Sequence, residues 1–134
     1  MTSRILIVED EALVAMELRF VLEDLGHDVV DAVADAGTAL DCARENHVDL
    51  ALVDIHLSDG PSGVLLGRRL AEEGLTVLYM TANPGMVMGG VSGPLGVLSK
   101  PVDETGVKRA VDYALRRRAG EPVEYAPPEL TVFA

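Results

Sequence analysis

The chain alternates between short runs of consecutive apolar residues and longer segments in which apolar residues recur every three or four positions. The short runs predict buried β-strands, and the longer segments predict amphipathic helices. The predicted strands cover about residues 4–8, 29–34, 50–54, 76–80 and 97–99. The predicted helices cover about residues 11–25, 37–46, 63–73 and 104–118. This alternation indicates an α/β fold with a parallel sheet that is covered by helices on both faces.

Right-handed crossovers between these strands predict a doubly wound, five-stranded parallel sheet of the flavodoxin-like type. We expect the strand order 2-1-3-4-5, which places the first and third strands side by side. Local residues agree with the helix boundaries, since Asp10 is placed to cap the first helix and Gly26 to end it. Between the third strand and the third helix, Asp59-Gly60-Pro61 predicts a turn.

Two segments depart from the regular alternation. Residues 83–94 contain four glycines and two prolines, so we expect an irregular or shortened fourth helix, with one short turn around residues 86–91. After residue 118 the chain has three prolines and no periodicity, which predicts an extended C-terminal tail over residues 119–134. The domain itself then spans residues 1–118. The apolar residues near the end of the tail are candidates for docking onto it: Leu130, Val132 and Phe133.

Composition and charge limit the classes of function. A length of 134 residues and a hydrophobic fraction of 49% suit one globular domain. The net charge of -11 disfavours direct DNA binding and binding to anionic membranes. No signal sequence or membrane span is recognisable, and the single cysteine, Cys42, fits a reducing compartment. We therefore expect a cytoplasmic protein.

Chemically active side chains stand at the ends of four predicted strands. Glu9 and Asp10 follow the first strand, Asp54 closes the third, and Thr81 and Lys100 follow the fourth and fifth. The carboxyl ends of parallel strands meet at one edge of the sheet, which is where open α/β sheets bind ligands. Three clustered carboxylates repel one another unless a cation joins them, which predicts a hard divalent metal, Mg²⁺ above all. The alternative is that the three acids are merely solvated side chains at strand ends. It does not explain why a lysine and a hydroxyl group stand at matching positions after the neighbouring strands.

Such an edge suits phosphoryl transfer. The Asp54 carboxylate can accept a phosphoryl group to give an acyl phosphate, and Mg²⁺ would neutralise the developing charge. Lys100 would hold a phosphoryl oxygen and could pair with Asp54 at rest, while the Thr81 hydroxyl would bind another oxygen. A cis peptide bond before Pro101 would aim the lysine inward.

Four motifs occur in a characteristic order and spacing: Ile-Val-Glu-Asp-Glu, Val-Asp-Ile-His-Leu, Met-Thr-Ala-Asn and Ser-Lys-Pro. Over about residues 4–118 the chain thereby resembles the receiver domain of two-component response regulators. The resemblance implies Asp54 as the phosphate acceptor. It also implies a Mg²⁺ site made by Glu9, Asp10 and Asp54, with the backbone carbonyl of His56 as a further ligand.

The same resemblance implies Thr81 as the switch hydroxyl and Lys100 as the phosphate-sensing lysine. The phosphodonor would be a phosphohistidine on a sensor histidine kinase or a histidine phosphotransfer protein. The chain departs from the family at Val97, where an aromatic residue is usual, and in the glycine-rich segment that replaces the fourth helix. A homodimer through the last helix is compatible with the family.

We therefore expect a stand-alone signalling switch or phosphorelay component whose output is protein–protein contact, because a separate output domain would need at least ~50 further residues. The alternative is a receiver-like interaction module that works without phosphate, which the Val97 departure favours. A Mg²⁺-dependent phosphohydrolase would need a second acid where the chain has His56. We therefore expect no enzyme beyond the domain's own phosphorylation and dephosphorylation.

The first predicted helix carries a second apolar stripe, made by Leu13, Met16 and Phe20. This stripe is either a docking patch for the helix bundle of a kinase or phosphotransfer protein, or a set of partly covered surface residues against which the C-terminal tail could pack.

Overall fold

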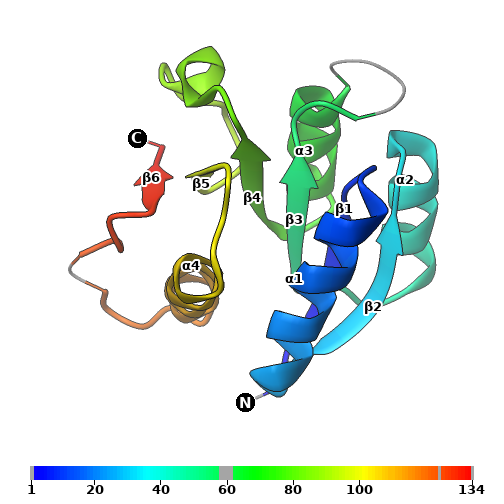
Figure 1. The fold of residues 1–134 in the computed structure, drawn as a ribbon, viewed down its shortest axis with the longest axis horizontal. Helices are drawn as coiled ribbons and strands as arrows, with labels where there is room; N and C mark the ends of the chain where they lie inside the picture. The colour runs from blue at the N-terminus through cyan, green and yellow to red at the C-terminus, as the bar shows by residue number, and fades with distance from the viewer. Residues whose placement is uncertain (1, 58–61, 124, 134) are drawn as a thin grey trace.

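The central layer of the molecule is a mostly parallel β-sheet (Figure 1). The computed structural model describes residues 2–57, 62–123 and 125–133. Within these residues the sheet has six strands in the order β2-β1-β3-β4-β5-β6. The strands are β1 (Arg4–Val8), β2 (Asp28–Val33), β3 (Leu50–Asp54), β4 (Thr76–Thr81), β5 (Gly96–Ser99) and β6 (Leu130–Val132). The first five are parallel and have the predicted order.

The prediction of five strands is wrong, because the C-terminal tail supplies a sixth. β6 runs antiparallel to β5 and places Leu130 opposite Leu98. An unpaired edge strand exposes backbone N–H and C=O groups as well as the flank of the core, and the tail covers this edge. Within the tail, residues 119–123 and 125–129 contain no helix or strand, as expected of an extended segment.

Helices cover both faces of the sheet (Figure 1). They are α1 (Ala12–Asp24), α2 (Ala36–Glu45), α3 (Gly63–Glu72) and α4 (Glu104–Arg118), with a 3-10 turn, η1 (Pro84–Val87). Because successive strand residues point to opposite faces, each strand contributes to two cores. Ile5 packs with α1 and α4, and its neighbour Leu6 packs with α2 and α3. The fully buried strands are therefore the near-continuous apolar runs that the sequence shows.

Several ends of the helices follow local rules. Asp103 caps α4 by accepting a hydrogen bond from a backbone N–H in the first turn, and Gly26, with a φ of 90°, follows the end of α1. The prediction that Asp10 caps α1 is wrong. Glu11 occupies the cap position and makes no side-chain capping bond, so the Asp10 carboxylate is left available at the edge of the sheet.

The segment between β4 and β5 contains no α-helix, as its glycines predict. η1 begins at Pro84, slightly earlier than the expected turn at residues 86–91. The turn predicted at residues 59–61 lies outside the described residues. Among the residues that the structure describes, no helix is both long enough and apolar enough to span a membrane.

Candidate functional site

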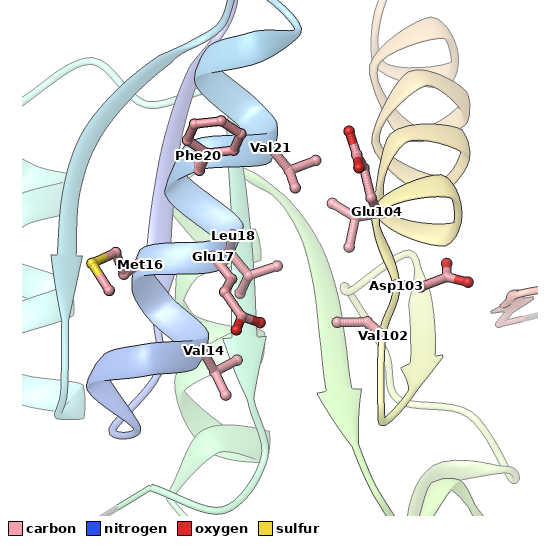
Figure 2. A pocket seen from close by; sticks show the side chains of 10 residues that line it. Val14, Met16, Glu17, Leu18, Phe20, Val21, Val102, Asp103 and Glu104 are labelled. Carbon is pink, nitrogen blue, oxygen red and sulfur yellow. The ribbon is translucent and has the colours of Figure 1, made fainter.

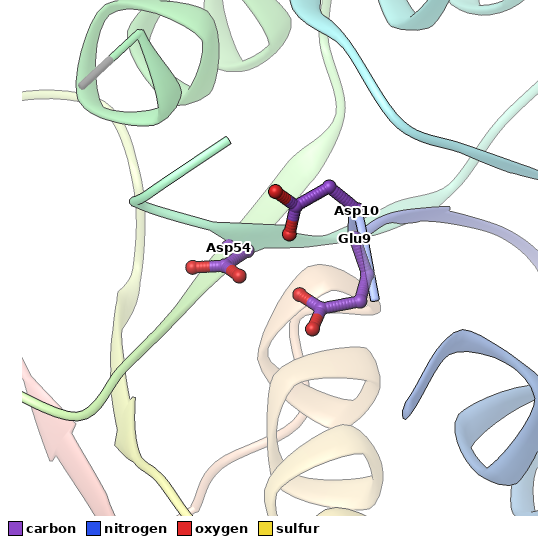
Figure 3. Close-up of side chains that lie close together, drawn as sticks. All are labelled: Glu9, Asp10 and Asp54. Carbon is purple, nitrogen blue, oxygen red and sulfur yellow. The ribbon is translucent and has the colours of Figure 1, made fainter. Parts of the chain in front are cut away.

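Three carboxylates meet at the carboxyl edge of the sheet. Glu9 and Asp10 follow β1, and Asp54 closes the neighbouring strand β3. Each side chain offers one oxygen, and these oxygens all lie within 4.8 Å of one another. Figure 3 shows the three side chains grouped at this edge. Glu9 and Asp54 are only 3% and 5% exposed, whereas Asp10 is exposed to solvent.

Lys100 joins the two buried acids. Its Nζ donates to Oε1 and Oε2 of Glu9 at 2.9 and 3.2 Å and to Oδ2 of Asp54 at 3.0 Å. The predicted resting pair between Lys100 and Asp54 is confirmed, but its bond to Glu9 was missed. The sequence places two acids after β1 and carries no signal for which of them faces the lysine. The Lys100–Pro101 peptide bond is cis.

The electrostatics of these three groups are tightly linked. Burial, and then the hydrogen bond with Asp54, raises the pKa of Glu9 to about 8. Burial alone would raise the pKa of Asp54, but hydrogen bonds with Glu9, Lys100 and the His56 N–H lower it overall. Burial alone would lower the pKa of Lys100, yet its bonds with the two carboxylates raise it. Asp54 is therefore the acid that stays ionised, and Glu9 is the acid that takes up a proton.

Thr81 and His56 lie beside this cluster. In the β3–β4 register Asp54 lies opposite Met80, so the buried Thr81 stands one residue further along the same edge. The Thr81 hydroxyl oxygen accepts a hydrogen bond from the Asn83 N–H at 3.0 Å, and the Thr81 carbonyl accepts one from the Lys100 N–H at 2.7 Å. The His56 N–H donates to Asp54 Oδ1 at 2.9 Å.

The chemistry of this donor set fits a hard divalent cation. Carboxylate oxygens are the ligands that Mg²⁺ prefers, and one or two protein carboxylates with waters are its usual environment. Burial is the main cause of the raised pKa of Glu9, and a cation bound to the cluster would favour the charged form of these acids. The role of the His56 carbonyl as a further ligand stays a prediction.

A groove of about 450 Å³ lies between α1 and the start of α4 (Figure 2). Val14, Val21 and Val102 line it together with the acids Glu17 and Glu104. Met16 lines this groove and also a second hollow that reaches Glu9 and Asp10.

The apolar stripe on α1 borders this groove and is open to solvent. Leu13, Met16 and Phe20 are 62%, 62% and 71% exposed. The interpretation that the C-terminal tail packs over this stripe is therefore wrong, because the tail runs to the opposite edge of the sheet and pairs with β5 (Figure 1).

Comparison with known proteins agrees with this geometry. The family model described as the response regulator receiver domain matches residues 5–112. The chain is 34% identical over 118 residues to the phyllosphere-induced regulator PhyR of Methylorubrum extorquens, covering 86% of this chain and 44% of that protein. It is 38% identical over 122 residues to the two-component response regulator PhoP of Pseudomonas aeruginosa, covering 87% and 53% respectively. It thus spans about half the length of the curated relatives that it matches.

Solved structures give the same result. The response regulator PhyR from Brucella abortus superposes with a TM-score of 0.82 at 30% identity, covering 90% of this chain and 50% of that one. The signal receiver domain of a modulated diguanylate cyclase from Desulfovibrio desulfuricans gives a TM-score of 0.75 at 32% identity, covering 91% and 100%. The family match extends over most of the sheet and includes every residue of the acid cluster and Lys100. The chain belongs to the response regulator receiver domain family.

Proposed function

We propose that this domain is a phosphorylation switch in which Asp54 accepts a phosphoryl group from a phosphohistidine of a sensor histidine kinase or a histidine phosphotransfer protein. The observation that carries the assignment is the buried contact between Asp54 Oδ2 and Lys100 Nζ, beside two further carboxylates. Membership of the receiver family supports the signalling role.

Glu9, Asp10 and Asp54, with the His56 carbonyl, would hold Mg²⁺, which supplies positive charge against the phosphoryl oxygens when bound. The lowered pKa of Asp54 keeps its carboxylate ionised, which is the form that attacks phosphorus. A carboxylate oxygen of Asp54 attacks phosphorus, an O–P bond forms, and the P–N bond to the donor histidine breaks with its electron pair left on nitrogen.

Two further side chains bind the transferred group. The Lys100 ammonium, already 3.0 Å from Asp54, pairs with one phosphoryl oxygen as a point charge. The Thr81 hydroxyl turns away from the Asn83 N–H, to which it is bonded at rest, and donates to another oxygen. The chemistry uses no other acid or base, so we propose no turnover beyond the domain's own phosphorylation and dephosphorylation.

The α1 groove is the surface that we propose for the phosphodonor. Exposed Met16 and Phe20 offer apolar contact for a helix of a kinase or phosphotransfer bundle. Met16 also lines the hollow that leads to Glu9 and Asp10, so a helix docked there would stand next to the acids. The acids of the groove, Glu17 and Glu104, would favour basic residues on that helix.

The output that we propose is protein binding in the cytoplasm. One solved relative is described as the anti-anti-sigma factor PhyR from Bartonella quintana, and this description supports the proposal of a protein target. A phosphate-independent interaction module is the second candidate. The specific observation in its favour is that the Lys100 ammonium itself pairs with both buried carboxylates, Glu9 and Asp54.

Intact-mass measurement after incubation with acetyl phosphate separates the two candidates. A phosphorylation switch gains one phosphoryl group in the presence of Mg²⁺, and Asp54→Ala abolishes the gain. Asp41→Ala, an exposed carboxylate on α2, serves as the matched control and should behave like the wild type. Unchanged mass with acetyl phosphate and with a phosphohistidine donor would favour the phosphate-independent module.

A further inference from the structure

The C-terminal tail closes the sheet and both hydrophobic cores at one edge. β6 pairs with β5, and the Phe133 N–H extends the pairing by donating to the Leu95 carbonyl at 2.9 Å. Leu130 is buried in the core under α1 and α4, while Phe133 packs against the core under α2 and α3. Gly96 permits this close approach, because a side-chain carbon there would overlap the backbone of Thr131.

This closure is held by a short segment. β6 has three residues, and the proline-containing stretch that connects it to α4 has no helix or strand in its described residues. Tyr125 in this stretch is 85% exposed, and the pair between Arg109 and Glu129 is long, at 3.5 Å, and partly exposed. Short strands tethered in this way open locally at a fraction of the global free energy of unfolding.

Phe133 is connected to Thr81 by a chain of contacts. The Thr81 hydroxyl accepts from the Asn83 N–H, and Asn83 leads into η1, where Val87 is buried in the core that Phe133 packs against. Tyr79 lies two residues before Thr81 on the same face of β4, and its ring centroid is 6.2 Å from that of Phe133. On the η1 side, Phe133 lies close to Gly90, whose N–H donates to the Val87 carbonyl, so Phe133 adjoins both segments that meet at Thr81.

We propose that residues 129–133, here named the latch, are released when Asp54 is phosphorylated, an inference that rests on the proposed function. The resting hydroxyl of Thr81 holds the Asn83 N–H. When that hydroxyl turns toward a phosphoryl group, the Asn83 N–H loses its acceptor, and the segment that carries Val87 loses an anchor. Phe133 then loses part of its packing, and β6 separates from the edge of β5.

Coupling between two sites is reciprocal. If phosphorylation weakens docking of the latch, then weakening the latch must favour the phosphorylated state. Lys100, which contacts Asp54, directly follows β5, the strand that the latch pairs with.

Amide hydrogen exchange of the full chain tests the latch. The exchange rates of residues 130–133 are compared in Mg²⁺ alone and in Mg²⁺ with beryllofluoride, a stable mimic of the phosphoryl group. We expect these amides to exchange faster, on the order of fivefold or more, while β1 amides stay unchanged. Equal or slower exchange at residues 130–133 would overturn the latch.

A parallel intact-mass measurement with acetyl phosphate separates this failure from failure of the proposed function. A phosphoryl group added without a change in latch exchange overturns the latch alone. No phosphoryl addition and no response to beryllofluoride overturn both.

Two variants open the latch without touching the acid cluster. Phe133→Ala removes the aromatic contact, and Gly96→Ala places a methyl group against the Thr131 backbone. Both should raise the phosphorylated fraction at subsaturating acetyl phosphate above that of the wild type. Tyr125→Ala, exposed in the same tail, is the matched control and should match the wild type. If Phe133→Ala and Gly96→Ala are phosphorylated like Tyr125→Ala, the latch is overturned.

Discussion

Replacing Lys100 by methionine tests the electrostatic account of the site. Methionine keeps most of the apolar stem and removes the ammonium group, whose Nζ lies 2.9 Å from Glu9 and 3.0 Å from Asp54. The two carboxyl groups are almost fully buried, and the lysine side chain is 18% exposed. The variant therefore leaves two acids in a poorly solvated site without a cation.

The size of the effect follows from these distances. Unit charges about 3 Å apart attract by about 5 to 6 kcal/mol at an effective dielectric constant of about 20, and the cost of burying the charges offsets part of this attraction. Removing one partner of a buried pair typically costs about 3–5 kcal/mol. Because Glu9 readily takes up a proton, we expect a loss in the free energy of unfolding of about 2–3 kcal/mol at about pH 8, and a smaller loss at about pH 5.5, where the acid is neutral.

Urea denaturation followed by circular dichroism measures this loss, first without metal and then with Mg²⁺. Mg²⁺ should recover a large part of the stability of Lys100→Met, since a ligand that binds the folded state stabilises it. Lys108→Met is the matched control, because Lys108 makes partly exposed pairs, which contribute little to stability. Equal stability of Lys100→Met and Lys108→Met at about pH 8 would refute the reasoning.

Two further predictions concern Glu9 and the packing around Tyr79. Since the folded state keeps a proton on Glu9 that the unfolded state loses above its ordinary value of 4.5, metal-free stability should fall as pH rises toward about 8. Glu9→Gln should remove that slope in denaturation curves, and parallel pH profiles would contradict the assignment. Gly67→Ala would press a methyl group into the Tyr79 ring and should cost about 2 kcal/mol. Gly37→Ala is the control, because the added methyl group meets only ordinary contact. It should be neutral or stabilising by up to ~1 kcal/mol. Equal midpoints of thermal unfolding for Gly67→Ala and Gly37→Ala would contradict this account of the packing.

Much of the fold and of the candidate site was predictable because the signals are local. A run such as Ile5–Val8, apolar at every position, fits a strand buried on both faces. The alternation with helices fixes the direction of the strands, so Asp54, Thr81 and Lys100 had to reach one edge. The segment between residues 83 and 94 likewise forms no α-helix, as the low helix propensity of its glycines predicts.

The features that sequence missed depend on contacts between distant residues. β6 has only three residues, too few to show a period, and it forms because β5 offers an open edge. The hydrogen bond between Lys100 and Glu9 joins residues 91 positions apart. Whether Glu9 or Asp10 bonds to the lysine depends on which of the two side chains points toward it at the end of β1. The predicted cap at Asp10 was wrong by one position, because the helix begins after Glu11.

The most direct test of the central claim is to locate the phosphoryl group. The full chain is incubated with Mg²⁺ and a phosphohistidine donor and then treated with borohydride, which reduces an acyl phosphate of aspartate to homoserine, and the product is mapped by peptide mass spectrometry. The account predicts homoserine at position 54 and at no other aspartate, with Mg²⁺ required. Reduction at Asp10 or another carboxylate, or labelling that does not depend on Mg²⁺, would contradict it.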